Sequence, residues 1–310
     1  MKYLYYLKIC TVLVLLMAGL AKASPLSSAV NKQSVQTATV VSNGLNHPYG
    51  VAVDKSGNVY IADTYNNRVL KEMLLSDDDK YDQSVVTSNG LNHPHSIAVD
   101  SIGNVYIADP YNNRVVKETL LSDGKTYSQS VVASGLDHPY GVAVDEGGNV
   151  YIADTYNKRV LKETLLRGDG GVTYSQSIVA NNLSYPNSVA VDDGGNIYIA
   201  DTGNNRVLKA TFSDGVYTQS VVASGLNSPE SVAVDGASGN VYIADVSHDR
   251  VRGNVSNDRI IKAIPLGERV YNQEVLARSN YCGNIAVGKG RDIYIADYNG
   301  NQVVKLTLPK

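Results

Sequence analysis

The chain has few cysteines, no tryptophan and a single long uncharged apolar run, and these scarcities exclude several classes of protein. Among its 310 residues only Cys10 and Cys282 are cysteines. Removal of an N-terminal segment containing Cys10 would leave no intrachain disulfide, so packing has to stabilise the fold. The 27 basic and 30 acidic residues give a formal net charge of −3. This acidic excess argues against nucleic acid or an anionic membrane as the main partner.

The apolar run lies near the N-terminus, at residues 10–20. Lysines precede it, and an Ala-Lys-Ala segment that ends at Ala23 follows it. This order is typical of a secretory signal peptide, and the run is too short to span a bilayer. We therefore expect a signal peptide at 1–23, a short linker at 24–33, no membrane insertion, and a secreted or periplasmic mature protein. Loss of the three lysines of the signal would bring the formal net charge to about −6.

One five-residue phrase, Val-Tyr-Ile-Ala-Asp with only Ile-for-Val variation, occurs six times. The copies end at Asp63, Asp109, Asp154, Asp201, Asp245 and Asp297. The spacings of 46, 45, 47, 44 and 52 residues are typical of propeller blades or helical arrays. A helical array would need apolar residues three and four apart, and the repeats lack that pattern.

The third repeat shows the expected order of strands within one unit. Strand a covers 140–145, strand b 150–154, strand c 160–165 and strand d 174–179, with turn residues between them. Four short strands rich in Val, Ile and Tyr describe one propeller blade.

The two ends of the chain indicate how the ring closes. The last repeat ends at Lys310 after its third strand, and residues 34–41 match the pattern of strand d. We therefore predict an all-β, six-bladed propeller of four-stranded antiparallel blades over residues 34–310. The N-terminal strand pairs with the last blade, which removes an exposed sheet edge.

The repeat unit reads Gly-Leu-x-x-Pro-x-Gly-Val-Ala-Val-Asp, then Gly-Asn-Val-Tyr-Ile-Ala-Asp, then Asn-x-Arg-Val, as in Gly44 to Val69. This unit resembles the NHL repeat over residues 34–310, and the resemblance implies a six-bladed propeller. It implies little about chemistry, because NHL-type propellers include RNA-binding modules, extracellular sensor domains, protein-interaction platforms and peptidyl-hydroxyglycine amidating lyases. The virginiamycin-lyase type of propeller fits poorly with a chain that has no tryptophan.

Residues that recur in every repeat are interpreted as structural. Asp54 and its equivalents, followed by a glycine such as Gly57, are expected to form the a-to-b turn. Asp63 and its equivalents are expected to cap the b-to-c turn and to pair with an arginine such as Arg68. A calcium site at these aspartates is the alternative, but calcium needs several converging oxygens.

The d-to-a loops differ between repeats and border the expected channel mouth. The residues before the loop proline, or at its place, are His47, His93, His138, Tyr185, Ser228 and Tyr281. The residues after it are Tyr49, His95, Tyr140, Asn187, Glu230 and Gly283, and the next along strand a are Gly50, Ser96, Gly141, Ser188, Ser231 and Asn284. Such a mixture of aromatic and polar groups is typical of a surface that binds a peptide or a sugar, and the alternative is a solvated rim without a ligand. We predict ligand contacts at Tyr49, His95, Tyr140, Asn187, Glu230, Tyr185, Tyr281 and Asn284.

The fifth repeat carries an insertion on the same face. The step from Asp245 to its arginine, Arg259, is 14 residues, against five in the first repeat. A rim loop over 246–258 with His248, Arg250 and Arg252 is predicted to lean over the channel or to contact a partner. A tolerated surface insertion is the alternative, because loop length costs little stability.

The sequence lacks a nucleophile elbow, a Gly-x-x-x-x-Gly-Lys-Ser/Thr loop and a His-Glu-x-x-His motif. We therefore predict a monomeric, non-catalytic binding module without a cofactor, whose channel face recognises a protein segment or a glycan. The alternative is a metal-dependent lyase or lactonase-like hydrolase that binds zinc through His47, His93 and His138. Zinc requires each nitrogen at about 2.0–2.1 Å, so three histidines on separate blades would all have to reach inward.

Overall fold

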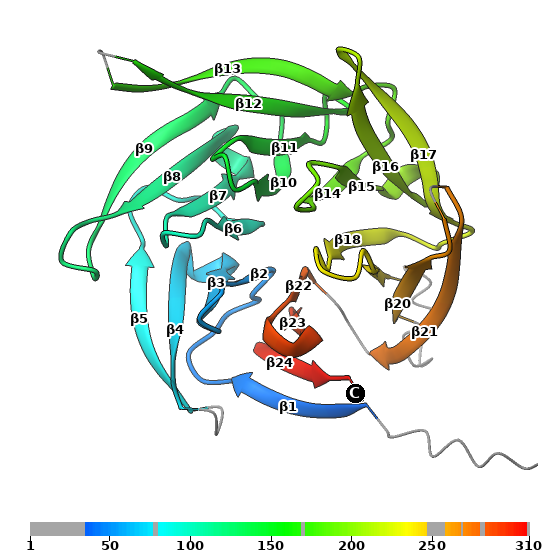
Figure 1. Ribbon diagram of the computed structural model, residues 1–310. Coiled ribbons are helices and arrows are strands. Elements are labelled where there is room, and N and C mark those ends of the chain that lie inside the picture. The colour runs from blue at the N-terminus through cyan, green and yellow to red at the C-terminus, as the bar shows by residue number, and fades with distance from the viewer. Residues whose placement is uncertain are drawn as a thin grey trace, which may run out of the picture. The chain divides into compact units, whose positions relative to one another are not determined.

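Six four-stranded antiparallel sheets surround a central axis in the computed structural model (Figure 1). The structure describes residues 35–76, 80–168, 171–246, 258–267, 269–279 and 283–308. In each sheet the strands follow one another outward from the axis in the order a, b, c, d. This confirms the predicted all-β, six-bladed propeller. The expected signal peptide and linker lie outside the described residues. No helix among the described residues is long and apolar enough to cross a membrane.

Blades one to five each use four consecutive strands. Blade one comprises β2 (Gly50–Val53), β3 (Val59–Asp63), β4 (Arg68–Ser76) and β5 (Lys80–Thr87). Blade two comprises β6 (Ile97–Val99), β7 (Val105–Asp109), β8 (Arg114–Leu120) and β9 (Tyr127–Ser134). Blade three comprises β10 (Pro139–Val144), β11 (Val150–Asp154), β12 (Arg159–Gly168) and β13 (Gly171–Ala180). Blade four comprises β14 (Pro186–Val191), β15 (Ile197–Asp201), β16 (Arg206–Ser213) and β17 (Val216–Ser224). Blade five comprises β18 (Pro229–Val234), β19 (Val241–Asp245), β20 (Asp258–Pro265) and β21 (Tyr271–Ser279).

Blade six joins the two ends of the chain. It comprises β22 (Ile285–Val287), β23 (Ile293–Asp297), β24 (Gln302–Thr307) and, as its outer strand, β1 (Gln36–Val41). Gln36 lies opposite Thr307 and Thr37 opposite Leu306. Figure 1 shows β1 in blue alongside β24 in red. The predicted closure by the N-terminal strand agrees with this sheet, and it pairs an edge that would otherwise be open.

The repeated Val-Tyr-Ile-Ala-Asp strand is buried on both of its faces, because each blade is packed between two others. Ile61 of β3 packs in a cluster with Tyr294 of blade six, whereas Tyr60 packs in a cluster with Val105 of blade two. An equivalent apolar cluster fills the space between each pair of adjacent blades. Complete burial of such a side chain contributes about 1.5–3 kcal/mol. The phrase is therefore continuously apolar up to its aspartate, and does not alternate with polar residues.

The a-to-b turns, which join the first two strands of each blade, form as expected from the sequence. Asp54 accepts hydrogen bonds from the backbone N–H groups of Ser56 and Asn58, both at 2.9 Å, and from the Tyr60 hydroxyl at 3.3 Å. Gly57 has a φ of +91°, which a residue without a Cβ adopts at low cost. The role of Asp54 as a turn former is confirmed.

Candidate functional site

The d-to-a loops and the b-to-c turns lie together on one face of the ring. Blades one, two and four make the b-to-c turn with the short 3₁₀ segments η1 (Thr64–Asn66), η2 (Pro110–Asn112) and η3 (Thr202–Asn204), and η4 (Lys289–Arg291) lies between β22 and β23. After η1, Asn67 adopts a left-handed conformation with a φ of 51°. Its Oδ1 accepts the backbone N–H of His93 in blade two at 2.7 Å. Asn301 and Asn113 accept the N–H groups of His47 and His138 in the same way, so these three turns fix the loop of the next blade.

A buried aspartate joins the loop and the turn within each of blades one to five. Asp63 is fully buried, and its Oδ1 accepts the N–H of Asn46 in the d-to-a loop at 2.7 Å. Its Oδ2 accepts Asn66 Nδ2 at 2.8 Å and Arg68 Nε at 2.7 Å. The arginine pairing is confirmed. The expectation that Asp63 caps the b-to-c turn was wrong, because its side chain makes no capping hydrogen bond to η1. The carboxylate bonds instead to the adjacent loop, which compensates the burial of its charge. In blade six, by contrast, Asp297 Oδ1 accepts the N–H of Gly300 in the turn at 2.9 Å.

Eight rings on this face form a continuous series that we name the aromatic arc. Its members, in order, are Tyr298, His47, Tyr65, His93, Tyr111, His138, Tyr156 and Tyr185. Successive ring centroids are 4.6, 4.8, 5.0, 5.1, 5.6, 4.5 and 5.7 Å apart, within the range of favourable aromatic pairs. Four of its tyrosines are 44–56% exposed, so the arc presents ring surface to solvent across blades one to four.

The three histidines of the arc share one hydrogen-bonding pattern. Nδ1 lies 2.8 Å from Asn46 Oδ1 in His47, 2.9 Å from Asn92 Oδ1 in His93 and 2.9 Å from Asp137 Oδ1 in His138. Because a carbonyl or carboxylate oxygen accepts, Nδ1 carries the proton in the neutral ring and Nε2 is left as an acceptor. The arc therefore combines imidazole acceptors with phenol groups.

The backbone of these histidines is strained. His47, His93, His138 and Tyr185 have φ values of 47–51° although each precedes a proline. Left-handed conformations of non-glycine residues cost about 1–3 kcal/mol and persist where surrounding contacts determine them. Here the backbone N–H groups of His47 and His93 donate to the Oδ1 atoms of Asn301 and Asn67, both at 2.7 Å, and supply those contacts. The positions of the rings in the arc are thus fixed before any ligand binds.

Inside the arc, three stacked rings and a glutamate occupy the channel mouth, and we name this group the hub. The His95 ring lies 3.7 Å from that of Tyr49 and 4.5 Å from that of Tyr140. The Tyr49 hydroxyl donates to Glu230 Oε2, and both residues are buried. Blade six lies between the blades of this pair and carries Gly283 at the equivalent position. Tyr49 and Glu230 of the hub are thus much less exposed than the tyrosines of the arc.

Burial in the hub changes the protonation of His95. Its Nδ1 lies 3.0 Å from the carbonyl oxygen of Tyr140. Loss of hydration lowers the pKa of its imidazole to about 3, and the bond to Tyr140 opposes this only weakly. The ring is therefore neutral at physiological pH, and Nε2 is its acceptor. Burial likewise raises the pKa of the Tyr140 hydroxyl.

The lowered pKa predicts a specific acid sensitivity. An unfolded chain binds a proton at His95 below its ordinary pKa of 6.5, whereas the folded chain does so only near 3. The stabilising contribution is thus complete above pH 6.5 and is lost as the pH falls. Between pH 6 and pH 4 the free energy of unfolding should decrease by about 2.5 kcal/mol more in the wild type than in His95→Gln. Urea unfolding of both proteins across this range measures the difference, and parallel curves would show that His95 titrates normally when folded.

The strand a positions behind the hub connect neighbouring blades. Ser188 Oγ accepts the N–H of Val232 at 3.2 Å, and Ser231 Oγ accepts the N–H of Ile285 at 3.0 Å. Asn284 is buried, and its Oδ1 has no hydrogen-bond partner among the described residues. These positions line a central channel of about 190 Å³. The serines at this level thus act between blades, which the sequence interpretation had not anticipated.

A family model for the NHL repeat matches residues 45–71, 91–117, 136–162 and 183–209. Each match runs from a d-to-a loop into strand c of blades one to four. The chain is an NHL-repeat protein. None of the curated proteins matches it in sequence.

Several solved structures share the fold of this NHL-repeat protein. A streptogramin B lyase has a TM-score of 0.60 and 16% identity, covering 90% of this chain and 99% of the lyase. A gluconolactonase from Xanthomonas campestris has a TM-score of 0.66 and 14% identity, covering 90% and 91%. A chain of the nidogen/laminin complex has a TM-score of 0.64 and 16% identity, covering 81% and 93%. At such identities the likeness concerns the fold alone.

The predicted contact residues that the structure describes lie in three different parts of this NHL-repeat protein: the hub, the arc and the channel wall. Tyr49, His95, Tyr140 and Glu230 meet in the hub, with Asn187 on β14 beside them. Tyr185 ends the arc, and Asn284 lies in the channel wall. Tyr281, His248, Arg250 and Arg252 lie outside the described residues, as does most of the predicted rim loop. Ligand binding by these residues stays a prediction.

The sequence interpretation missed the tyrosines of the b-to-c turns. Tyr65, Tyr111 and Tyr156 each follow the strand b aspartate by two residues, whereas blade four has Gly203 there. This variation between blades was the signal that could have revealed them. The recurring aspartate of this turn indicates only a structural role, which is why the tyrosines beside it were not predicted.

His47, His93 and His138 do not meet at the axis. A tyrosine ring lies between each successive pair, with Tyr65 4.8 Å from His47 and 5.0 Å from His93. The described part of the chain contains no group of three or more His, Cys, Asp or Glu side chains arranged to share a metal ion. In this geometry the histidines belong to the aromatic surface of the NHL propeller.

Proposed function

We propose that this NHL propeller is a non-catalytic binding module that recognises a glycan or a protein segment along the aromatic arc. The observation that carries the proposal is the uninterrupted contact of eight rings, four of them tyrosines about half exposed to solvent. Exposed tyrosines in fixed positions supply contact area at low entropic cost, and they are frequent at binding surfaces.

Of the two ligand classes, a neutral glycan fits the chemistry of the arc best. Imidazole Nε2 atoms accept hydrogen bonds from hydroxyl groups, and phenol groups both donate and accept. Two side chains of opposite charge contact the arc: Asp137 is bonded to His138, and Lys158 Nζ lies 5.9 Å from the Tyr185 ring centroid. An uncharged, hydroxyl-rich ligand needs no compensating charge on this face.

The fold is compatible with this function without specifying it. A chain of the nidogen/laminin complex has the same architecture, and so do a streptogramin B lyase and a gluconolactonase. We also propose export to the periplasm or the medium, where extracellular glycans occur, on the basis of the sequence of residues 1–23.

Replacement of one arc tyrosine tests the proposal. A glycan or peptide array identifies a ligand, and titration calorimetry then compares the wild type with Tyr111→Ala. We expect about a tenfold loss of affinity, because removal of a stacked aromatic anchor costs on the order of 1–2 kcal/mol. Phe212→Ala is the matched control, since Phe212 is 57% exposed but belongs to blade four outside the arc.

Two results would contradict the proposal. One is a ligand whose affinity is the same for wild type, Tyr111→Ala and Tyr156→Ala. The other is stoichiometric zinc in the purified protein whose removal by a chelator abolishes an activity. The second result would support the alternative prediction of a metal-dependent lyase or lactonase-like hydrolase that uses His47, His93 and His138.

A further inference from the structure

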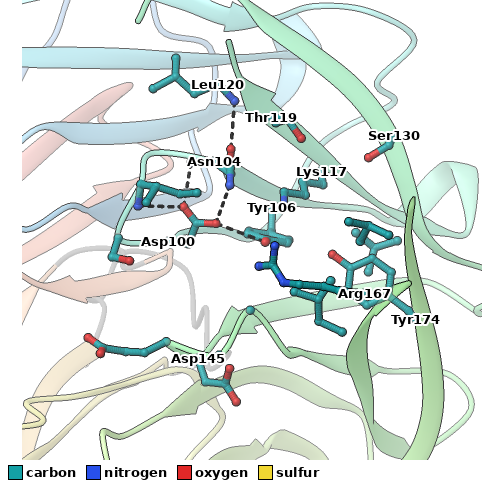
Figure 2. Close-up of a pocket in the computed structure, with 18 of the residues that line it drawn as sticks. Asp100, Asn104, Tyr106, Lys117, Thr119, Leu120, Ser130, Asp145, Arg167 and Tyr174 are labelled. Atoms are coloured by element: carbon teal, nitrogen blue, oxygen red, sulfur yellow. Dashed lines mark hydrogen bonds between the residues drawn. The ribbon is translucent and has the colours of Figure 1, made fainter. Parts of the chain in front are cut away.

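A second cavity, of about 1020 Å³, lies between blades two and three, away from the arc (Figure 2). The a-to-b turns that begin at Asp100 and Asp145 line it, so it lies on the side of the blades opposite to the arc. Strands β8 and β9 of blade two and β12 and β13 of blade three supply its walls. Its chemistry differs from that of the arc and of the channel.

The walls combine polar side chains with a set of exposed apolar ones. Ile102 is 73% exposed, and Leu121, Val131 and Val172 are also exposed large apolar side chains. They come from both blades. A ligand with an apolar body could therefore bury surface on two sides at once, at about 25 cal/mol per Å².

Two cations enter the same cavity without a carboxylate partner. Lys117 of β8 places its Nζ 5.2 Å from the Tyr106 ring centroid, and Figure 2 shows Arg167 of β12 directed toward the same ring. Neither side chain forms an ion pair with a described residue. Asp100 lies nearby, but Asn104 and the Tyr106 hydroxyl already donate to its carboxylate, as the dashed lines in Figure 2 mark.

The position of Arg167 is particular to blade three. It stands eight residues after the first arginine of strand c, where blades one and two have Ser76 and Ser122. The lysine, in contrast, recurs, since Lys71, Lys162 and Lys209 lie over Tyr60, Tyr151 and Tyr198 in the same manner. Arg167 therefore has no structural role that is common to all blades.

The electrostatics of the pair favour an anion between them. Burial lowers the pKa of the Lys117 ammonium, Asp100 opposes that change, and Arg167 adds to it by repulsion. A bound carboxylate would offset the burial and the repulsion together, through charge-assisted hydrogen bonds. Arginine presents a planar fork that matches a carboxylate.

We propose that this cavity binds a small monoanionic amphiphile, with its carboxylate between Lys117 and Arg167 and its apolar body against Leu121, Val131 and Val172. The rim of the cavity carries Asp100, Asp145 and Glu146, which repel a multiply charged group. A single carboxylate is therefore preferred over a phosphate dianion. The site does not depend on the function proposed for the arc.

Octanoate is the probe, titrated calorimetrically into the full chain. Saturable binding at one site is expected, with at least tenfold weaker binding of octanol and of inorganic phosphate. Arg167→Gln and Lys117→Met should each weaken octanoate binding about tenfold, in line with the loss of a charge-assisted bond. Lys71→Met is the matched control, because Lys71 has the same place over Tyr60, 5.4 Å from its centroid, but lies outside the cavity.

The outcomes separate this site from the arc. Tyr111→Ala should bind octanoate as the wild type does, whatever its effect on the ligand of the arc. The proposal is overturned if octanoate does not saturate, if Arg167→Gln binds it as tightly as the wild type, or if octanol or phosphate binds equally well. Arg167 is exposed, so its replacement reports on binding and not on folding.

Discussion

A variant with Gln36→Cys and Thr307→Cys is expected to form a disulfide and to gain about 3–4 kcal/mol of stability over its reduced form. The two residues are exposed and lie opposite each other in β1 and β24. Opposed residues of antiparallel strands have Cα atoms about 4.5–5.5 Å apart, which is within the range a disulfide spans. The bond would close a loop of almost the whole propeller, which restricts the unfolded chain strongly.

Mass spectrometry and urea unfolding, with and without reductant, measure this effect. Cys10→Ser and Cys282→Ser should be present in all proteins, so that the native thiols do not compete. Gln36→Cys with Ser84→Cys is the control, since Ser84 is also exposed but belongs to β5 of blade one. Failure of the first pair to oxidise in the folded protein would mean that the N-terminal strand does not close the ring.

The sequence was sufficient for the ring because each blade repeats the same physical requirements. The strand b phrase is buried on both faces, and Asp54 with Gly57 makes the turn that precedes it. Because the same pattern occurs six times, an uncertain strand or turn in one repeat can be assigned from the others. The strand d pattern at residues 34–41 then determined the closure, because only the last blade lacked a strand.

The residues of the hub were among the predicted contact residues, but their contacts with one another could not be predicted, because they join distant blades. Tyr49 and Glu230 are 181 residues apart, on two blades that both neighbour blade six. A comparison of equivalent positions shows that the residues differ, but not which of them meet. The same limit applies to Ser188 and Ser231, whose hydroxyls were grouped with a ligand surface but accept hydrogen bonds from the next blade.

The arc was half predicted for a different reason. The shared position of three histidines, His47, His93 and His138, suggested a zinc site as the alternative interpretation. The tyrosines that separate them come from the other loop of each blade, the b-to-c turn. The d-to-a loop and the b-to-c turn are separated in the sequence of each repeat, yet they contribute alternate rings to one surface. Neither loop alone therefore indicates the aromatic arc.

Gly50→Ala is expected to destabilise the fold by about 3 kcal/mol, since it overpacks the contact between the innermost strands of two blades. A Cβ at position 50 would stand 2.3 Å from the carbonyl oxygen of His95 and 3.0 Å from the Cβ of Ala62. The first neighbour is backbone and cannot rotate away. Either β2 or the loop that carries His95 has to move, and that movement would also disturb the stacking of His95 between Tyr49 and Tyr140.

Gly168→Ala supplies the comparison, because a Cβ there meets nothing within 4 Å and the backbone is outside the left-handed region. Its stability should stay within about 0.5 kcal/mol of the wild type, or rise slightly through a less flexible unfolded chain. Gly141→Ala should fall between the two, since its nearest neighbours, the Asn187 oxygen and the Ser188 Cα, are both 2.9 Å away. Urea unfolding of the three variants gives the order. If Gly50→Ala were as stable as Gly168→Ala, the inner strands would be farther apart than the hub requires, and the fixed position of His95 would lose its physical basis.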